Sequence, residues 1–427
     1  MRKVEERGPR VVEAQSHGPA AAVTRRAADR LRAGHLWVYR SDVETLVPPV
    51  GATDIDGGAL VTVMDSRGIP LGTGLYSATS QIAVRMVSAE TALTRNGYLE
   101  QVRERMFAAL TLREEVAPWS KKNDACRLVF SEADGLPGIV ADRYNDLVIL
   151  QLLTQGTALD DIRAVLTEVI RERLKPKTIL ERPDPKIREL EQLAAPSPGP
   201  LYSVGDLPNL TTVFTINGLR FHYDASSGQK TGAFLDQRLN YAAAAHYGRG
   251  SALDVCTYQG GFAIHLAQGC DRVTGVDASR GALEVADRNL ELNSGLNGQL
   301  MAKVDWIEAD AFEFLREYEA NGERYDTIVL DPPAFAKSKR AAEGAMRGYK
   351  ELNLRAMKML TPGGTLVTCS CSHHVPLTEF TEVVAAAASD TGRRVQVLEI
   401  RGAAPDHPAV LTLPETSYLK CLICRVG

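Results

Sequence analysis

Residues 252–262 read Ala252-Leu253-Asp254-Val255-Cys256-Thr257-Tyr258-Gln259-Gly260-Gly261-Phe262, an apolar run that ends in a pair of glycines and leads into a helical pattern. A short apolar run of this kind is typical of a strand buried on both faces of a parallel sheet. Glycine lets the backbone approach a ligand closely, and the first turn of a helix offers free N–H groups. The stretch therefore predicts a strand, a turn and a helix that together bind polar groups of a ligand.

Apolar runs alternate with amphipathic stretches through the rest of the C-terminal half. The runs cover residues 252–256, 273–277, 304–308, 327–330 and 365–369, and helical patterns cover 282–293 and 344–360. This alternation is typical of a parallel sheet with helices on both faces. We therefore expect residues 216–427 to form a Rossmann-like α/β domain.

Acidic or glycine-rich segments stand at the ends of the first four of these runs. In open parallel sheets, ligands bind outside the carboxyl ends of the strands, where a carboxylate accepts hydrogen bonds from ribose hydroxyls. A single aspartate in such a place is often only a helix cap, but four in order favour a nucleotide-like cofactor. The spacing departs from the G-x-G-x-x-G of nicotinamide sites, so we predict S-adenosylmethionine. The residues expected to bind it are Asp254, Tyr258, Gly260, Gly261, Asp277, Ala278, Asp310, Ala311 and Asp331.

A polar segment precedes the first strand of this domain, at residues 228–238. Within it, Lys230 is suited to neutralise the methionine carboxylate of the cofactor, and Gln229 or Thr231 to donate a hydrogen bond to it. The alternative is a solvated loop followed by a capped helix.

Two segments are candidates for the chemistry of methyl transfer. Asp331-Pro332-Pro333-Ala334-Phe335 is a rigid turn that presents a carboxylate and carbonyls to a planar base, with Phe335 able to stack on a ring. Thr368-Cys369-Ser370-Cys371-Ser372 follows the fifth run, beside the expected cofactor. A thiolate that adds to C6 of a pyrimidine turns C5 into a nucleophile. Cys371 suits that role, and Asp331 suits the carboxylate that holds the base; the alternative is that Cys369 and Cys371 are inert packing residues.

Basic residues follow the Asp-Pro-Pro turn and recur near the N-terminus. Beside the expected active site they predict contacts with RNA phosphates, although a solvated helix face would have the same composition. The candidates are Phe335, Lys337, Lys339, Arg340 and Lys350, with Arg32, His35 and Trp37 in the N-terminal region.

The N-terminal half predicts a tail and two further domains. Residues 1–20 are rich in charge, Gly, Pro and Ala, which is typical of disorder. Short strand-like runs separated by turns in residues 21–92 predict a small β-barrel. A long helix over residues 94–115, further strands and a second helix over 158–174 predict a central α/β domain within residues 93–215.

The composition excludes some classes of protein. The chain has 427 residues, a formal charge of −4 and seven cysteines, an odd and scattered set that favours reduced thiols in the cytoplasm. No apolar run reaches the roughly 18 residues of a membrane-spanning helix. The spacing of Cys421 and Cys424 resembles half of a zinc site, but no second pair accompanies it, so we expect no metal.

Taken together, these segments resemble the RlmI-type 23S ribosomal RNA cytosine-C5 methyltransferases over essentially the whole chain after residue 20. The segments that carry the resemblance are Arg32-Ala33-Gly34-His35-Leu36-Trp37-Val38, Ser80-Gln81-Ile82-Ala83-Val84-Arg85, Gly228-Gln229-Lys230-Thr231-Gly232-Ala233-Phe234-Leu235-Asp236-Gln237-Arg238, Asp331-Pro332-Pro333-Ala334-Phe335, Gly348-Tyr349-Lys350-Glu351-Leu352-Asn353 and Ser370-Cys371-Ser372.

The resemblance implies a PUA-like RNA-binding β-barrel, a central EEHEE-type α/β domain and a class I methyltransferase domain. It implies S-adenosyl-L-methionine as cofactor, S-adenosyl-L-homocysteine as product, large-subunit ribosomal RNA as partner, and Cys371 rather than Cys369 as nucleophile. The sequence is compatible with a homodimer.

Some positions depart from the family pattern. The family usually has an aromatic residue at the position of Cys256, Thr at that of Gln259 and Phe at that of Cys369. These departures leave three alternatives open: methylation of a nitrogen on an RNA base through the Asp-Pro-Pro turn, methylation of a small molecule, and a non-catalytic role in ribosome assembly.

Overall fold

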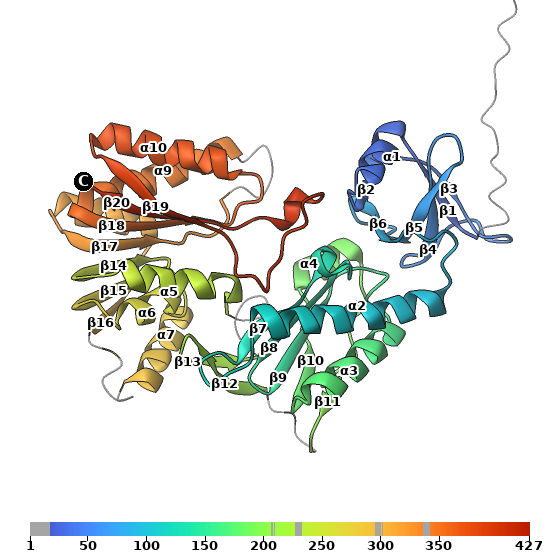
Figure 1. Cartoon of the computed structure of the whole chain (residues 1–427), viewed down its shortest axis with the longest axis horizontal. Coiled ribbons are helices and arrows are strands. Elements are labelled where there is room, and N and C mark those ends of the chain that lie inside the picture. The colour runs from blue at the N-terminus through green and yellow to red at the C-terminus, as the bar shows by residue number, and fades with distance from the viewer. Residues whose placement is uncertain are drawn as a thin grey trace, which may run out of the picture.

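The computed structural model has three regions, each built around its own sheet (Figure 1). It describes residues 18–205, 208, 210–226, 233–294, 300, 302–335 and 342–427. The N-terminal sheet, the central sheet and the C-terminal sheet follow one another along the chain, as the colour gradient from blue to red shows. The fold is mixed α/β with a Rossmann-like C-terminal domain, as the sequence predicts.

The C-terminal domain contains a seven-stranded sheet with the order β16-β15-β14-β17-β18-β20-β19. Strands β14 to β18 are parallel to their neighbours, and β20 runs antiparallel between β18 and β19. The strands are β14 (Ser251–Val255), β15 (Arg272–Asp277), β16 (Lys303–Glu308), β17 (Tyr325–Leu330), β18 (Leu360–Ser370), β19 (Val395–Arg401) and β20 (Lys420–Val426). The strand order changes direction at β14 and β17, so the crevice at their carboxyl ends is the expected ligand site.

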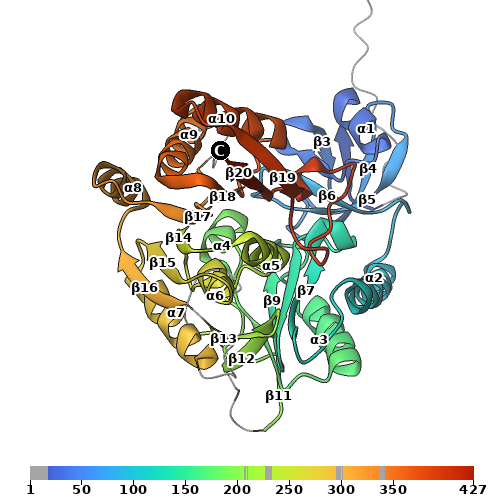
Figure 2. The same ribbon diagram turned by 60° about the vertical axis from the view of Figure 1, so that its left-hand side comes forward.

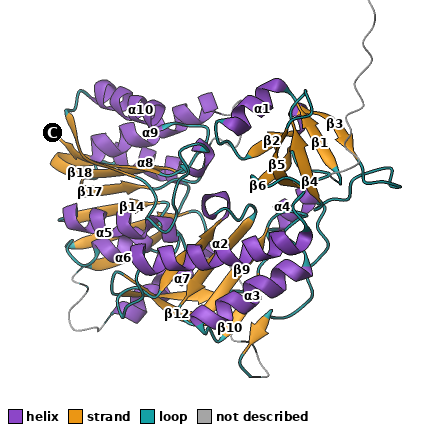
Figure 3. Ribbon diagram, turned by 45° about the vertical axis from the view of Figure 1, so that its right-hand side comes forward, coloured by secondary structure: helices purple, strands orange, loops and turns teal. Residues whose placement is uncertain are grey.

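Helices cover both faces of this sheet, as Figure 3 shows. Buried side chains of α5 and α6 pack with Ala252 and Val329 on one face. Those of α8, α9 and α10 pack with Leu253 and Ile328 on the other. The helices are α5 (Arg238–Tyr247), α6 (Gly261–Leu266), α7 (Arg280–Asn293), α8 (Ala311–Ala320), α9 (Ala342–Met359) and α10 (Leu377–Thr391). Burial on both faces explains why the inner strands β14, β17 and β18 read as apolar runs.

The central domain is a five-stranded sheet of order β11-β10-β9-β8-β7, with α2 and α3 packed on one face. Apolar residues of α2 such as Val102 and Met106 contact Leu128 and Leu150 of the strands. The elements are α2 (Arg95–Val116), β7 (Ala125–Phe130), β8 (Ile139–Tyr144), β9 (Leu147–Leu152), α3 (Asp160–Leu174), β10 (Thr178–Glu181), α4 (Pro185–Glu191) and β11 (Tyr202–Ser203).

A hairpin of β12 (Thr211–Ile216) and β13 (Leu219–Asp224) joins the central and C-terminal domains. Phe214 and Phe221 of the hairpin share one apolar cluster with Tyr144 of the central domain and Ile264 of α6. The boundary at residues 215 and 216 that the sequence suggests therefore falls inside β12, within a core that the two domains share. Figure 2 shows the hairpin between α7 and the central sheet.

The N-terminal domain is a curled six-stranded sheet of order β2-β6-β5-β4-β1-β3, packed against α1. Its elements are β1 (Ala20–Val23), α1 (Arg25–Arg32), β2 (Trp37–Tyr39), β3 (Val43–Val47), β4 (Leu60–Met64), β5 (Pro70–Tyr76) and β6 (Ile82–Ser88). Ala20 already pairs with Val47 and Thr62 and is fully buried, so the end of the expected 1–20 tail belongs to the sheet. The rest of that tail, residues 1–17, lies outside the described residues.

Buried polar contacts hold the N-terminal domain on the central one. The guanidinium of Arg85 lies 3.6 Å from the Glu132 carboxylate and 3.5 Å from that of Glu191, and both acids are nearly buried. Ser77 donates to Glu191 at 2.8 Å. Removing one partner of such a buried charge group costs several kcal/mol, so these contacts fix the placement of the domain.

The segment between β19 and β20, residues 402–419, contacts all three domains. Its Asp406 accepts from the backbone N–H of Arg127 in β7 and from Arg238 of α5. A Cβ on Gly34 would lie 2.9 Å from its Thr412. In Figure 1 this dark-red segment extends from the C-terminal sheet toward the other two domains.

Of the helices in the described part of the chain, none is both long enough and apolar enough to cross a bilayer.

Candidate functional site

The turn after β14 is held in an unusual backbone conformation. Cys256 and Tyr258 have positive φ angles of 64° and 51°, and Gly260 follows at 82°. Non-glycine residues adopt this region at a cost of about 1–3 kcal/mol each, and they do so mostly where a functional site requires it. A Cβ on Gly261 would lie 2.6 Å from the Tyr241 ring, so only glycine fits where α6 begins. The turn is thus a strained loop with its backbone close to the sheet edge.

The Asp254 carboxylate holds this turn in place through two hydrogen bonds. Its Oδ2 accepts a hydrogen bond from Thr257 Oγ1 at 2.6 Å and one from the Ala263 N–H at 2.9 Å. Its Oδ1 belongs to the buried polar atoms that lack a hydrogen-bond partner within the described residues. An unpartnered buried carboxylate oxygen is costly unless a ligand or water meets it.

Asp277, at the end of β15, ties the turn to the neighbouring strand. Its two carboxylate oxygens accept from the backbone N–H groups of Tyr258 and Ser279, each at 2.9 Å. Each oxygen keeps further acceptor capacity, and the residue is half-buried at the carboxyl edge of the sheet, with Ala278 after it. It is therefore placed where a carboxylate can accept hydrogen bonds from ribose hydroxyls.

Asp310 is exposed and caps α8. Its Oδ1 accepts from the N–H groups of Phe312 and Glu313, at 2.9 and 3.1 Å. This is the helix-cap arrangement that any single strand-end aspartate can have. Asp310 and Ala311 lie at the same edge as Asp277, and their part in cofactor binding stays a prediction.

Asp331 lies beside β14 at the centre of this edge. Its N–H donates to Val255 O at 3.2 Å, and its Oδ1 accepts from Gln237 Nε2 at 2.9 Å. Burial, with the charges of Asp236 and Asp254, raises the pKa of Asp331 to about 8, and burial likewise raises the pKa of Asp254 to about 7. Such a group of buried carboxylates favours a ligand that carries positive charge, because a cation relieves their mutual repulsion.

Cys371 meets the Asp-Pro-Pro turn across 39 residues of sequence. Its Sγ donates to Pro332 O at 3.9 Å. The residues on either side of it are fixed by Tyr349 of α9, whose hydroxyl bonds to Ser370 Oγ at 3.0 Å and Ser372 Oγ at 2.9 Å. The structure thus brings the two predicted chemical segments together and leaves Cys371 half-buried, whereas Cys369 is fully buried.

Asp236, Tyr418 and Lys420 lie at this site but were not among the candidates from sequence. Asp236 lies in the short helix before α5, and its Oδ2 accepts from Tyr418 Oη at 2.5 Å. Lys420, the first residue of β20, donates to Ser372 O and Tyr418 O, both at 2.7 Å. A lysine that opens the apolar run Cys421–Val426 is the signal that could have identified it, since buried lysines are rare.

The other predicted residues of the C-terminal domain have different surroundings. The Phe335 ring packs 4.9 Å from that of Tyr349 and 5.8 Å from that of Phe312. Lys350 pairs with Asp390 at 2.7 Å. Their roles in RNA binding stay predictions, and the predicted Gln229, Lys230, Thr231, Lys337, Lys339 and Arg340 lie outside the described residues.

The structure places the N-terminal candidates in contacts between and within domains. Trp37 Nε1 donates to Glu132 of the central domain at 2.8 Å, and His35 Nε2 lies 3.7 Å from Glu415 of the C-terminal domain. Arg32 donates to the nearly buried Asp65 at 2.5 Å. Trp37 and His35 therefore help to dock the domain, whereas Arg32 forms an ion pair within it, and the role of all three as RNA contacts stays a prediction.

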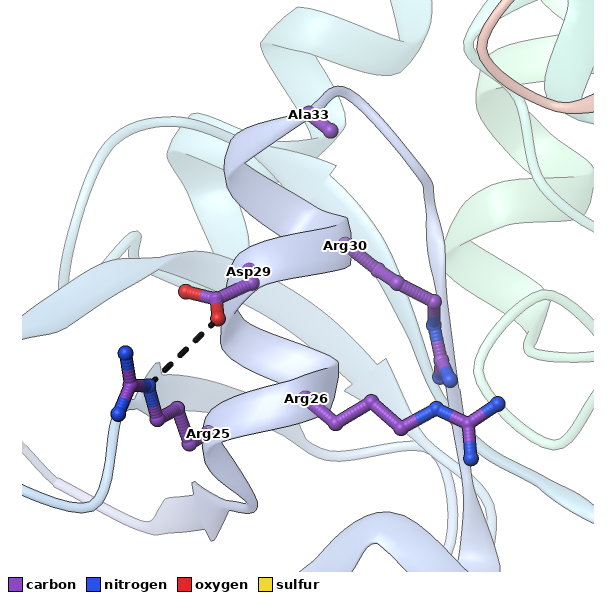
Figure 4. A pocket seen from close by; sticks show the side chains of 5 residues that line it. All are labelled: Arg25, Arg26, Asp29, Arg30 and Ala33. Carbon is purple, nitrogen blue, oxygen red and sulfur yellow. Dashed lines mark ion pairs between the residues drawn. The ribbon is translucent and has the colours of Figure 1, made fainter.

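The helix α1 offers a different basic surface in the same domain. A surface hollow of about 640 Å³ is lined by Arg25, Arg26, Asp29, Arg30 and Ala33. Figure 4 shows Arg25 turned toward Asp29, while the side chains of Arg26 and Arg30 extend together to the other side of the helix. Arg25 and Arg26 are exposed, so this is the arginine-rich surface of α1 that solvent reaches.

Comparison with known proteins agrees with the geometry. Residues 22–89 match a PUA-like domain, and residues 202–422 match the S-adenosylmethionine-dependent methyltransferase family. The chain is 36% identical over 396 residues to the ribosomal RNA large subunit methyltransferase I of Klebsiella pneumoniae strain 342, covering 92% of this chain and 94% of the relative. It is 38% identical over 397 residues to the protein of the same name from Shewanella amazonensis, covering 92% and 95%.

The fold also matches a solved structure. SMU.776, determined in complex with S-adenosylhomocysteine, superimposes with a TM-score of 0.77 over 95% of this chain and 99% of that one, at 18% identity. At that identity the likeness concerns the fold alone.

Proposed function

This chain belongs to the RlmI family of S-adenosylmethionine-dependent ribosomal RNA large subunit methyltransferases, and from that premise we propose that it methylates C5 of a cytosine in 23S ribosomal RNA through Cys371. The observation that carries the proposal is the contact between Cys371 Sγ and Pro332 O, which places a half-buried thiol beside Asp331 at the ligand-binding edge of the sheet.

The residues at this edge fit S-adenosylmethionine, which supplies the methyl group from a positively charged sulfonium when bound. Asp277 would accept from the ribose hydroxyls, and the strained turn at Tyr258, Gly260 and Gly261 would present its backbone to the cofactor. The raised pKa of Asp254 supports this assignment, because a cation beside this carboxylate favours its charged form.

Cys371 and Asp331 have separate roles in activating the cytosine base. The Cys371 thiolate adds to C6, and the electrons of the C5–C6 double bond move toward C5 and the N3 side of the ring. Asp331, whose pKa of about 8 keeps it largely protonated at pH 7, donates to N3 and stabilises that charge. C5 then takes the methyl group, which leaves S-adenosylhomocysteine, and loses its proton to water. The N3 proton returns to Asp331, and the C6–S bond breaks to restore the ring and the thiolate.

A second candidate is methylation of a nitrogen on an RNA base. In that reaction the Asp331 carboxylate and the Pro332 carbonyl would accept from an amino group. Cys371 Sγ donates to the same carbonyl, so the thiol already uses part of the acceptor capacity that an amine would need. This contact makes the carbon target the better supported of the two.

Nucleoside analysis tests the proposal. The purified enzyme is incubated with deuterated S-adenosylmethionine and 23S RNA from cells that lack the gene, and the RNA is digested for mass spectrometry. We expect deuterated 5-methylcytidine. A labelled guanosine, adenosine or N4-methylcytidine instead would overturn the carbon target, and cofactor binding without any labelled nucleoside would favour an assembly role.

The basic surface of α1 leads to a prediction about RNA affinity. The double variant R25E/R26E is expected to bind 23S RNA fragments at least tenfold more weakly, and the salt dependence of log Kd is expected to fall by about one for each lost phosphate contact. Filter binding between 50 and 200 mM salt measures both.

Arg324→Glu is the matched control, because Arg324 is exposed but directly precedes the amino end of β17, away from the carboxyl ends of the strands. If the dependence of log Kd on salt were unchanged in R25E/R26E, α1 would not be part of the RNA-binding surface.

A further inference from the structure

Lys420 is an unusual residue for its place in the fold. It opens β20, pairs in register with Ser370 of β18, and is only 6% exposed. The rest of β20 is an almost entirely buried apolar strand. Lysine is rarely buried to this degree, because transfer of an ammonium group from water is costly without compensation.

The contacts of the ammonium group direct it to the nucleophile. Its two bonds, to Ser372 O and Tyr418 O, end on backbone carbonyls, which leave its charge unneutralised. One of these carbonyls belongs to the residue that follows Cys371. The ammonium group therefore lies beside the backbone of the Cys371 segment, where a negative charge on Cys371 favours the charged form of Lys420.

Lys420 nevertheless carries its charge at neutral pH. Burial lowers its pKa to about 8, and the negative charge of Cys371 acts in the opposite direction. Below about pH 8 the ammonium form therefore dominates, which is the range in which a thiolate at Cys371 needs a counter-charge.

Among the described residues, the other ionisable groups beside Cys371 do not supply a positive charge. Tyr349 of α9 and Tyr418 face it, and burial raises the pKa of both hydroxyls, so they stay neutral. Asp236 accepts from Tyr418 and is an acid. His373 is exposed, with its ring 5.4 Å from that of Tyr418. Arg127 acts on Tyr418 but is paired with Asp142. In the described part of the chain, Lys420 is thus the buried cation that contacts the Cys371 segment.

We propose that Lys420 is a positioning residue that stabilises the thiolate form of Cys371 and holds the Ser372 carbonyl so that the sulfur faces the Asp331-Pro332 turn. This inference rests on the proposed role of Cys371 as nucleophile. The thiol proton passes to water, and Lys420 keeps its own proton throughout. A cation beside a cysteine raises the fraction of thiolate at neutral pH, and the thiolate is the species that attacks.

The test measures alkylation of Cys371 rather than methylation. Full-length protein is treated with iodoacetamide between pH 5.5 and 10, and peptide mass spectrometry gives the rate at Cys371. In the wild type the midpoint of the rate profile is expected below about 8.5, the value of an unperturbed thiol. In Lys420→Met and Lys420→Gln the midpoint is expected to rise by about one pH unit or more, with an about tenfold slower reaction at pH 7.

Lys420→Arg is the matched control, because it keeps the charge and can donate to both carbonyls. Its profile is expected to stay close to the wild type, whereas a merely structural lysine would leave all profiles at the same midpoint. Calorimetric binding of S-adenosylhomocysteine checks that each variant is folded. If the neutral variants do not fold, the midpoints of the wild-type and Lys420→Arg profiles still test whether the Cys371 thiolate is stabilised.

A wild-type midpoint at or above 8.5, or neutral variants with an unchanged profile, would overturn the inference. Because alkylation needs no RNA, its outcome is separate from the target of methylation. A shifted profile in an enzyme that makes no 5-methylcytidine would leave the inference standing and reject the proposed function.

Discussion

Replacement of Cys371 by alanine is expected to lower the rate of 5-methylcytidine formation by about 1,000-fold or more, because C5 of cytosine is a poor nucleophile until a thiolate has added to C6. The variant keeps Asp277, Asp254 and the strained turn, so its affinity for S-adenosylmethionine is expected to be unchanged. Single-turnover incubation with labelled cofactor, followed by nucleoside analysis, measures the rate.

Cys369→Ala is the matched control within the same motif. Cys369 is fully buried, its pKa is raised well above the usual value by a hydrogen bond with Cys421 that favours the protonated thiol and by burial, and it pairs in register with Cys421. A thiol that stays protonated is a poor nucleophile. We expect this variant to keep its rate within about tenfold. Full turnover by Cys371→Ala would show that its thiol is a packing group and would favour a nitrogen target.

Replacement of Asp277 by alanine is expected to weaken S-adenosylmethionine binding by about 100-fold. Two causes act together. The variant loses the charged acceptor for the ribose hydroxyls, and hydrogen bonds to charged groups contribute about 1.5–3 kcal/mol. It also releases the Tyr258 N–H, which the carboxylate holds at 2.9 Å and which keeps the positive-φ turn in place. Isothermal titration calorimetry measures the loss.

Two controls accompany this variant. Asp271→Ala removes an exposed carboxylate that precedes the amino end of the same strand, at the edge away from the site, and is expected to leave the affinity unchanged. Asp277→Asn keeps one acceptor oxygen and is expected to fall between the alanine variant and the wild type. If Asp277→Ala retained the wild-type affinity, another residue at this edge of the sheet would have to bind the ribose.

The sequence was sufficient for most of the C-terminal sheet. Strands β14, β15, β17 and β18 contain short apolar runs because both faces are buried, and this pattern needs no tertiary information. β19 was missed because Gln396, Glu399 and Arg401 interrupt its apolar residues, as expected of a strand at the edge of the sheet. The helix α1 was seen only as a cluster of arginines, since its buried face consists of two small residues, Ala27 and Ala28.

The positions of residues at strand ends could be predicted from the sequence, whereas backbone strain and contacts between distant segments could not. The places of Asp254, Asp277 and Asp331 at strand ends follow from strand order alone, whereas the choice of Cys371 over Cys369 came from the resemblance to the family, and the roles of these residues stay predictions. The positive φ angles of Cys256 and Tyr258 do not follow from strand order, because neither residue type indicates that conformation.

The contacts between the N-terminal domain and the other domains could not be predicted from the sequence for another reason. Trp37 is a plausible stacking residue by type, yet its N–H donates to Glu132, 95 residues away. A sequence pattern reports the period of one element and carries no information about which domain covers its surface.

The central claim, a covalent adduct between Cys371 and C6 of a cytosine, is tested most directly by trapping. RNA that carries 5-fluorocytosine at the target cannot lose a proton from C5 after methyl transfer, so the C6–S bond persists. With S-adenosylmethionine present, the wild type is expected to form a denaturation-resistant complex whose cross-linked peptide contains Cys371, and Cys371→Ala is expected to form none. The absence of this complex from an enzyme that methylates unmodified RNA, or a complex that persists in Cys371→Ala, would contradict the account.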